Sequence, residues 1–191
     1  MALVVGTNCG FVTSAPTSDP NGGQSGTLIS MAASTQGRAR AAKFTTPASA
    51  ITITEIGWWC DNATAEANFE VGIYTHDSTN NLPQDLLSGA SKTNAKGTTS
   101  GWKVVSGLNI VLNASTAYWI AIQQDANLTN ETYTDGEVTG VDRRDFRNVD
   151  TLPDPTWDDT SGNSSNNTLA FYGLYSTAQP DTEKMLLLFL K

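Results

Sequence analysis

Hydrophobic and polar residues alternate along this chain in short runs that end at turn-forming residues. Four such runs lie between residues 66 and 125: Asn68–Tyr74, Gly101–Val105, Leu108–Leu112 and Ala117–Gln123. Clusters of Gly, Pro, Asn, Ser and Thr separate them. β-Branched and aromatic residues favour strands, whereas the separating residue types favour turns. The pattern therefore predicts an all-β fold with an antiparallel sandwich or barrel architecture.

The run 51–60 predicts a strand with one covered face. Ile51 and Ile53 alternate with threonines, as expected of a half-buried strand. The phase of this alternation changes at Glu55–Gly57, where the apolar side chains move to the formerly polar face. A one-residue β-bulge near this point would restore the alignment.

Two further runs indicate how the sheets are covered. Ala117–Gln123 carries apolar side chains on both faces, which predicts a central strand or one that a neighbouring chain covers. On Asn68–Tyr74, alternate residues from Phe69 to Ile73 share a core face, whereas Tyr74 is predicted to point outward.

The chain is predicted to form one domain with an N-terminal arm. Residues 1–37 are the arm, and 38–191 are a single β-sandwich with a core module at 40–125. Either the arm pairs at the edge of its own sheet, or it reaches onto a neighbouring subunit. The apolar residues near the two ends that are candidates for assembly contacts are Leu3, Val4, Val5, Leu186, Leu188 and Leu190.

Charge argues against two classes of partner. The net charge of −8 is unfavourable for binding nucleic acid or an anionic membrane surface. The basic residues Arg143, Arg144 and Arg147 lie among aspartates, which favours a locally neutralised loop or edge strand over an anion-binding site. The longest apolar run, Met185–Leu190, is far shorter than the roughly 20 residues of a membrane-spanning helix. No signal peptide is visible, so the chain is expected to be cytoplasmic, or made in the cytoplasm and released by lysis, or a mature form whose leader has been removed. Synthesis without a visible signal peptide and a place on a virion or an extracellular surface are the expectation.

Few residues suit catalysis. His76 is the only histidine and lies in a predicted turn, and no Gly-x-Ser-x-Gly motif is present. A glycoside hydrolase with paired carboxylates is the enzyme that remains to be considered, and it is less favoured than a non-catalytic function. No cofactor is expected. The acidic stretch from Asp150 to Asp159 could hold a structural calcium ion, but prolines interrupt it, and a solvated loop is preferred.

Aromatic residues are the candidates for recognising a glycan or a protein partner. Trp58 and Trp59 are adjacent on a strand, so one belongs to the core and the other meets solvent, a loop or a partner. Trp59, Trp157 and Tyr133 are the candidate contacts.

The two cysteines are too few and too far apart to form a zinc-binding motif. Cys9 and Cys60 are predicted to be small buried side chains, with a disulfide between them as the alternative.

Several of these segments together resemble the jelly-roll β-sandwich modules of bacteriophage virion accessory proteins and of related secreted bacterial surface proteins. The segments are Lys43–Phe44, Ile51–Trp58, Phe69–Tyr74, Leu82–Pro83, Leu86–Leu87 and Thr116–Gln123. The resemblance covers roughly residues 40–125 and implies an antiparallel jelly-roll-like sandwich. It implies no fixed catalytic residues.

Three functions follow as expectations. The first is a structural, non-catalytic virion or surface-assembly protein, such as a capsid decoration or fibre-like component, that self-associates into a homo-oligomer through its arm and C-terminal strand. The second is a carbohydrate-binding module that recognises polysaccharide through exposed aromatics. The third, a hydrolase, is the least favoured because His and organised acid pairs are scarce.

Overall fold

The structure is a computed structural model of the chain. It describes residues 3–20, 27–30, 37–60, 68–87, 92–95, 97, 99–124, 131–135, 143–147, 151–153, 157 and 168–177. In 27–30, 92–95, 131–135, 143–147 and Thr168 it describes the backbone only. Every regular element within these ranges is a β-strand, which confirms the predicted fold class.

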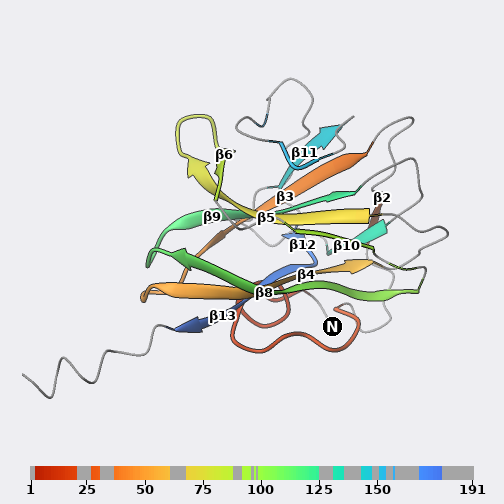
Figure 1. Cartoon of the computed structure of the whole chain (residues 1–191), viewed down its shortest axis with the longest axis horizontal. Helices are drawn as coiled ribbons and strands as arrows, with labels where there is room; N and C mark the ends of the chain where they lie inside the picture. The colour runs from red at the N-terminus through yellow and green to blue at the C-terminus, as the bar shows by residue number, and fades with distance from the viewer. Residues whose placement is uncertain are drawn as a thin grey trace, which may run out of the picture.

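The strands form two large sheets and one small sheet (Figure 1). The four-stranded sheet has the order β1 (Gly10–Val12), β13 (Phe171–Thr177), β4 (Ile51–Cys60) and β8 (Gly101–Leu112). The six-stranded sheet contains β11 (Arg143–Arg147), β3 (Arg38–Thr45), β9 (Ala117–Gln124), β5 (Asn68–Asp77), β6 (Leu82–Leu86) and β7 (Lys92–Ala95), which pairs with β5. The small sheet has the order β12 (Thr168–Leu169), β10 (Glu131–Asp135) and β2 (Thr27–Ser30).

Two strand pairs wind together to give the jelly-roll character. Consecutive strands β3 and β4 lie in opposite sheets, and so do β8 and β9. β4 pairs antiparallel with β8 in one sheet, while β3 pairs antiparallel with β9 in the other. The unit formed by β3 and β4 therefore runs alongside the unit formed by β8 and β9 in both sheets. This is the winding of a jelly roll. β9 is central between β3 and β5, as its two apolar faces predicted.

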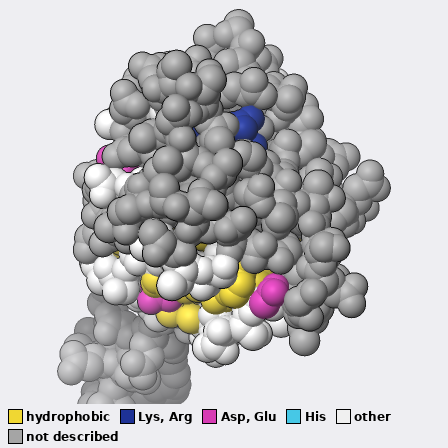
Figure 2. All heavy atoms as spheres, turned by 90° about the vertical axis from the view of Figure 1, so that its right-hand side faces the viewer, with side chains coloured by type: hydrophobic (Ala, Val, Ile, Leu, Met, Phe, Trp, Pro, Cys, Tyr) yellow, Lys and Arg dark blue, Asp and Glu magenta, His cyan; other side chains and the backbone are white. Residues whose placement is uncertain are grey.

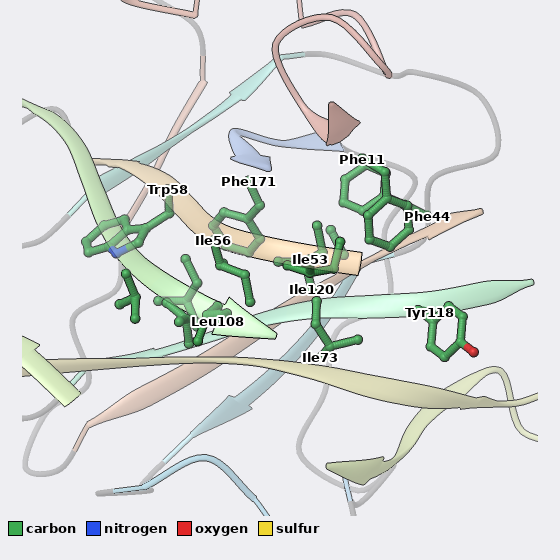
Figure 3. Close-up of a cluster of buried hydrophobic side chains, with 14 of the residues drawn as sticks. Phe11, Phe44, Ile53, Ile56, Trp58, Ile73, Leu108, Tyr118, Ile120 and Phe171 are labelled. Atoms are coloured by element: carbon green, nitrogen blue, oxygen red, sulfur yellow. The ribbon is translucent and has the colours of Figure 1, made fainter. Parts of the chain in front are cut away.

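The core lies between the two large sheets (Figure 3). Ile53, Ile56 and Trp58 of β4 meet Ile73 of β5 and Ile120 of β9, and all five are fully buried. Aromatic rings interlock at angles, as Trp58 does with Phe69 at a centroid distance of 5.5 Å. Burial of the apolar side chains between them is the main force that holds the two sheets together.

The bulge predicted in β4 is present, one residue before the expected position. The register of β4 against β8 shifts between Ile53 and Glu55. Its register against β13 shifts between Leu174 and Tyr175, opposite the same point. The shift brings Ile53 and Ile56 onto one face, so a strand with an apparent phase error still buries every isoleucine.

Part of the outer face of the six-stranded sheet is covered as well, and this differs from the sequence-based prediction for Tyr74. Leu152 and Trp157 pack with Tyr74 and Trp119 on the outside of the six-stranded sheet. Tyr74 was predicted to point outward. It does leave the core, but it is 0% exposed, because this distant segment lies over it.

The first strand of the four-stranded sheet comes from the segment predicted to be a separate arm. β1 pairs in parallel with β13, with Phe11 opposite Gly173. Phe11 also reaches the main core, where its ring lies 6.3 Å from that of Phe44. Residues 3–20 therefore contact the sandwich of their own chain.

Candidate assembly surface

β8 forms one edge of the four-stranded sheet. It is twelve residues long, and among the described residues it pairs only with β4. Val104 and Val111 on its outer face are exposed, 38% and 69% respectively, whereas its inward residues Val105 and Ile110 are buried. The backbone groups along such an edge can pair with another strand.

An irregularity interrupts β8 near its middle. Ser106 and Gly107 are consecutive and both exposed, and Gly107 has a φ of +74°, a conformation that favours glycine. Because of this irregularity, the inward-facing positions are odd-numbered before it (Lys103, Val105) and even-numbered after it.

A signal for this surface is present in the sequence. Val104 and Val105 are adjacent apolar residues, and Ile110–Leu112 is an apolar triplet, so both faces of this strand carry apolar side chains. A two-sided pattern of this kind predicts a strand that is covered on both sides. That β8 is an edge strand could not be predicted, because strand order depends on non-local pairing.

The N-terminal residues lie on the outer face of the same sheet. Leu3 and Cys9 are buried with Trp59 and Ala170 in a small apolar cluster. The next two residues differ from Leu3, since Val4 is 46% exposed and Val5 44% exposed. Of the arm residues proposed for assembly, Leu3 is thus used within the chain, and the two valines are open to solvent.

Trp59 is one of the candidate glycan contacts. It is only 9% exposed, and its ring packs edge-on against Trp102 at 5.5 Å. The indole N–H of Trp102 donates to the Ser18 carbonyl oxygen at 2.9 Å, so the N-terminal segment is tied across this aromatic pair. Trp58 and Trp59 point to opposite faces, as predicted, and the loop that meets Trp59 belongs to the same chain.

Tyr172 completes this aromatic cluster. Its ring lies 5.0 Å from that of Trp102, and its hydroxyl donates to Glu55 Oε1 at 2.7 Å. The ring rests on Gly57, where a Cβ atom would come within 2.2 Å of it. Burial, together with the adjacent Glu55 carboxylate, raises the pKa of Tyr172 well above its ordinary value.

Trp157, the second aromatic candidate, is buried. It is 4% exposed and packs edge-on against Tyr74 at 5.6 Å. The Tyr74 hydroxyl donates to the Pro153 carbonyl oxygen at 2.6 Å, and the backbone N–H of Leu152 donates to Glu70 Oε2 at 2.7 Å. The prediction that Trp157 presents its ring to a ligand is therefore wrong for this structure: the ring lies against the outer face of the six-stranded sheet.

His76 lies in a defined environment at the end of β5. The indole N–H of the buried Trp119 donates to His76 Nδ1 at 3.2 Å. Lys43 Nζ lies 5.6 Å from the centroid of the Trp119 ring and donates to Asn81 Oδ1 at 2.6 Å. His76 therefore stabilises the sheet end through Trp119. No triad of nucleophile, base and acid is formed by these groups.

The turn after His76 is held by Asp77. The Asp77 carboxylate accepts hydrogen bonds from the side chain and backbone of Asn80 and from the backbone N–H of Thr79. The Asn80 side chain and then the Thr79 backbone lower the pKa of this carboxyl below its ordinary value. This explains the turn on local grounds, without a ligand.

Buried arginines were not anticipated from the sequence. Arg38 and Arg40 are 8% and 2% exposed, and in the β3–β9 pairing Arg38 lies opposite the buried Gln124. In the β3–β11 register, Arg40 lies opposite Asp145. β11, which contains the Arg143–Arg147 cluster, is an edge strand, one of the two forms predicted for it.

The cysteines are not joined, which corrects the disulfide alternative. Cys9 and Cys60 are both buried thiols. They belong to different apolar clusters on opposite faces of the four-stranded sheet: Cys9 packs with Trp59 outside, and Cys60 lies in the main core. The sheet itself separates the two sulfur atoms, and this is the physical reason why no bond forms.

Some predicted residues fall outside what the structure describes. These are the side chain of Tyr133, the C-terminal Leu186, Leu188 and Leu190, and most of the acidic stretch 150–159. Within the described residues, no three His, Cys, Asp or Glu side chains are grouped so as to hold a metal ion. Nor do those residues include a helix of the length and apolarity required to cross a bilayer.

The surface charge of the described residues is sparse. Figure 2 looks at the side of the molecule that is on the right in Figure 1. On this face the described Lys and Arg side chains do not spread into a patch, and apolar side chains gather beside acidic ones.

In comparisons with protein-family models, with curated proteins and with solved structures, nothing matches this chain. Among the described strands, β8 combines the longest sheet edge with exposed apolar side chains.

Proposed function

We propose that this chain is a structural, non-catalytic subunit that self-associates through a sheet edge. Capsid decoration proteins and fibre-like virion or surface components are the class of protein that this proposal implies. The observation that carries it is β8, a twelve-residue edge strand with Val104 and Val111 exposed.

A long edge strand is a template for pairing with another chain, and monomeric proteins usually protect it with charges, prolines or a short length. The outer face of β8 between Val104 and Val111 carries Ser106 and Asn109 and no charged residue. Among the described residues, the irregularity at Gly107 and the inward-facing Lys103 are the protective features of this edge, and a regular segment remains on each side of Gly107.

The carbohydrate-binding alternative receives less support. Two of its three candidate aromatics, Trp59 and Trp157, are 9% and 4% exposed, so neither offers the flat open ring on which a sugar stacks. A glycan could still be bound elsewhere, and glycan-array binding by the purified chain would favour that function over assembly.

The test is the oligomeric state in solution. Light scattering of the purified chain should give a mass that is a multiple of 20.3 kDa. Val111→Lys should shift the population to monomer, because a charge at the edge opposes pairing. Val111 is 69% exposed, so this change should leave the fold intact.

Matched variants separate the possible surfaces. Gln84→Lys, at an exposed position on β6 in the other large sheet, should keep the wild-type mass. Val4→Lys tests the arm, and removal of residues 184–191 tests the C-terminal tail. A wild-type chain that stays monomeric at millimolar concentration would contradict the proposed function.

A further inference from the structure

We propose that two copies of this chain pair β8 against β8 in antiparallel fashion about a two-fold axis, so that Val104 of one copy lies opposite the partner's Val111. This inference rests on the proposed function and deepens it by naming the partner, the strand and the register. A two-fold interface uses the same surface on both copies, and a strand edge can pair with itself in this way only when antiparallel.

The pattern of buried and exposed residues in β8 is similar from either end of the strand. Lys103 to Ser106 are buried, exposed, buried and exposed in turn. Leu112 to Asn109, taken in reverse order, are also buried, exposed, buried and exposed. In an antiparallel pair, directly opposite residues lie on the same face of the sheet. If Lys103 faces the partner's Leu112, each of these four residues therefore meets a residue from its own face.

The irregularity in β8 makes this match possible. In a regular strand, the inward-facing residues are either all odd-numbered or all even-numbered. A register that pairs odd-numbered with even-numbered residues would then place inward-facing residues opposite outward-facing ones. Here the parity changes between Val105 and Leu108, at Gly107. Between Lys103 and Leu112, an exposed position meets a buried one only in the two symmetry-equivalent central pairs, each formed by Gly107 of one copy and Leu108 of the other. Glycine has no side chain to point to the wrong face.

More than one register places residues of the same face opposite each other, and the exposed valines favour one of them. A two-residue slip also keeps the faces matched, but it sets Val104 against the partner's Asn109 and Val111 against the partner's Trp102. The proposed register instead covers Val104 with the partner's Val111, and symmetry repeats this contact. Apart from the arm residues Val4 and Val5, these are the large apolar side chains exposed in the described part of the chain. Mutual burial of two such apolar pairs favours the proposed register.

The pairing would join two four-stranded sheets into one continuous sheet. It would also place the partner's Ile110 opposite Val105, so the two cores would meet at the axis. The main cores already reach this edge, because Val105, Leu108 and Ile110 are all part of the buried cluster.

Site-specific crosslinking tests the register. Val104→Cys and Val111→Cys are made as separate single variants, mixed, and treated with a short bifunctional thiol reagent. Directly opposite Cβ atoms lie about 5 Å apart, so the mixture should give a crosslinked dimer. Neither variant alone should do so, because two copies of the same position would be about 20 Å apart along the strands. The wild-type chain is the control for reaction at Cys9 and Cys60, which are buried.

The outcomes separate this inference from the function on which it rests. A mixture of Val104→Cys with Asn109→Cys that crosslinks instead would overturn the register and establish the slipped one. An oligomer that gives no β8 crosslink, and that dissociates when residues 184–191 are removed, would overturn β8 self-pairing while the assembly function stands. A monomer in every sample would overturn both.

Discussion

Tyr172 links three parts of the outer face through one side chain. Its ring lies on Gly57 and against Trp102, and its hydroxyl donates to Glu55 at 2.7 Å. The ring therefore fits only because residue 57 has no side chain. The hydrogen bond joins β13 to β4 in addition to the backbone ladder.

The raised pKa of Tyr172 predicts a loss of stability in alkali. In the unfolded chain the phenol loses its proton near pH 10, whereas in the folded chain it keeps the proton to higher pH. The contribution of this group is complete below about pH 10 and decreases as the pH rises further, because the unfolded state then releases a proton that the folded state retains.

Tyr172→Phe should therefore lose less stability than the wild type between about pH 9 and pH 11. At neutral pH the variant should be less stable by about 1.5–3 kcal/mol, the usual contribution of a hydrogen bond to a charged group. Urea denaturation of both proteins at several pH values measures the difference. Parallel pH profiles for the two proteins would contradict the prediction.

At the scale of elements, the six-stranded sheet depends on a distant segment to cover its outer face. Leu152 and Trp157 lie over Tyr74, Ala121 and Trp119. Two hydrogen bonds, from Tyr74 to Pro153 and from Leu152 to Glu70, fix the cover in place. Small side chains on the neighbouring strand β3, Ala39 and Ala41, leave room for the large rings.

Trp157→Ala should destabilise the protein by about 3–5 kcal/mol, as expected for removal of a buried tryptophan. The comparison variant is Val4→Ala, at a position 46% exposed, which should change the free energy of unfolding by less than about 0.5 kcal/mol. Chemical denaturation measures both. If Trp157→Ala were as stable as Val4→Ala, the covering segment would have no structural role.

At the scale of the whole molecule, both sheets end in strands that have no further partner among the described residues. β11 lies at one edge of the six-stranded sheet and β6 and β7 at the other, whereas β1 and β8 limit the four-stranded sheet. β1 is three residues long, β7 is four, and β6 and β11 are five each, so they offer short edges, whereas β8 offers twelve residues. Length alone makes β8 the edge with the largest capacity for pairing.

Association through β8 predicts a melting temperature that depends on concentration. Binding to the folded state stabilises it by mass action, so the melting temperature should rise with protein concentration. Val111→Lys should abolish this dependence while leaving the melting temperature of the dilute protein nearly unchanged. Scanning calorimetry over a hundredfold range of concentration provides the measurement, and a wild-type value that does not change with concentration would count against association.

Much of the fold could be predicted because it depends on neighbours along the chain. Alternation alone placed Ile51 and Ile53 on the covered face of their strand, and both are in the core. Ala117–Gln123 is apolar on both faces, which predicted a central strand or one that a neighbouring chain covers, and β9 is central. The adjacency of Trp58 and Trp59 also determined that they point to opposite faces. Strand geometry has a period of two residues, so a few consecutive positions suffice for these conclusions.

The candidate site depended on contacts between distant residues and could not be predicted in this way. Trp157 and Tyr74 are buried because segments about 80 residues apart lie together, and nothing near either residue in the sequence indicates the other. The same holds for Trp59, which the N-terminal residues cover. The sequence by itself determined which residues form strands and which faces are apolar. Only the tertiary structure decided which apolar faces are covered and which strand is left at an edge, because strand order arises from pairing between distant segments.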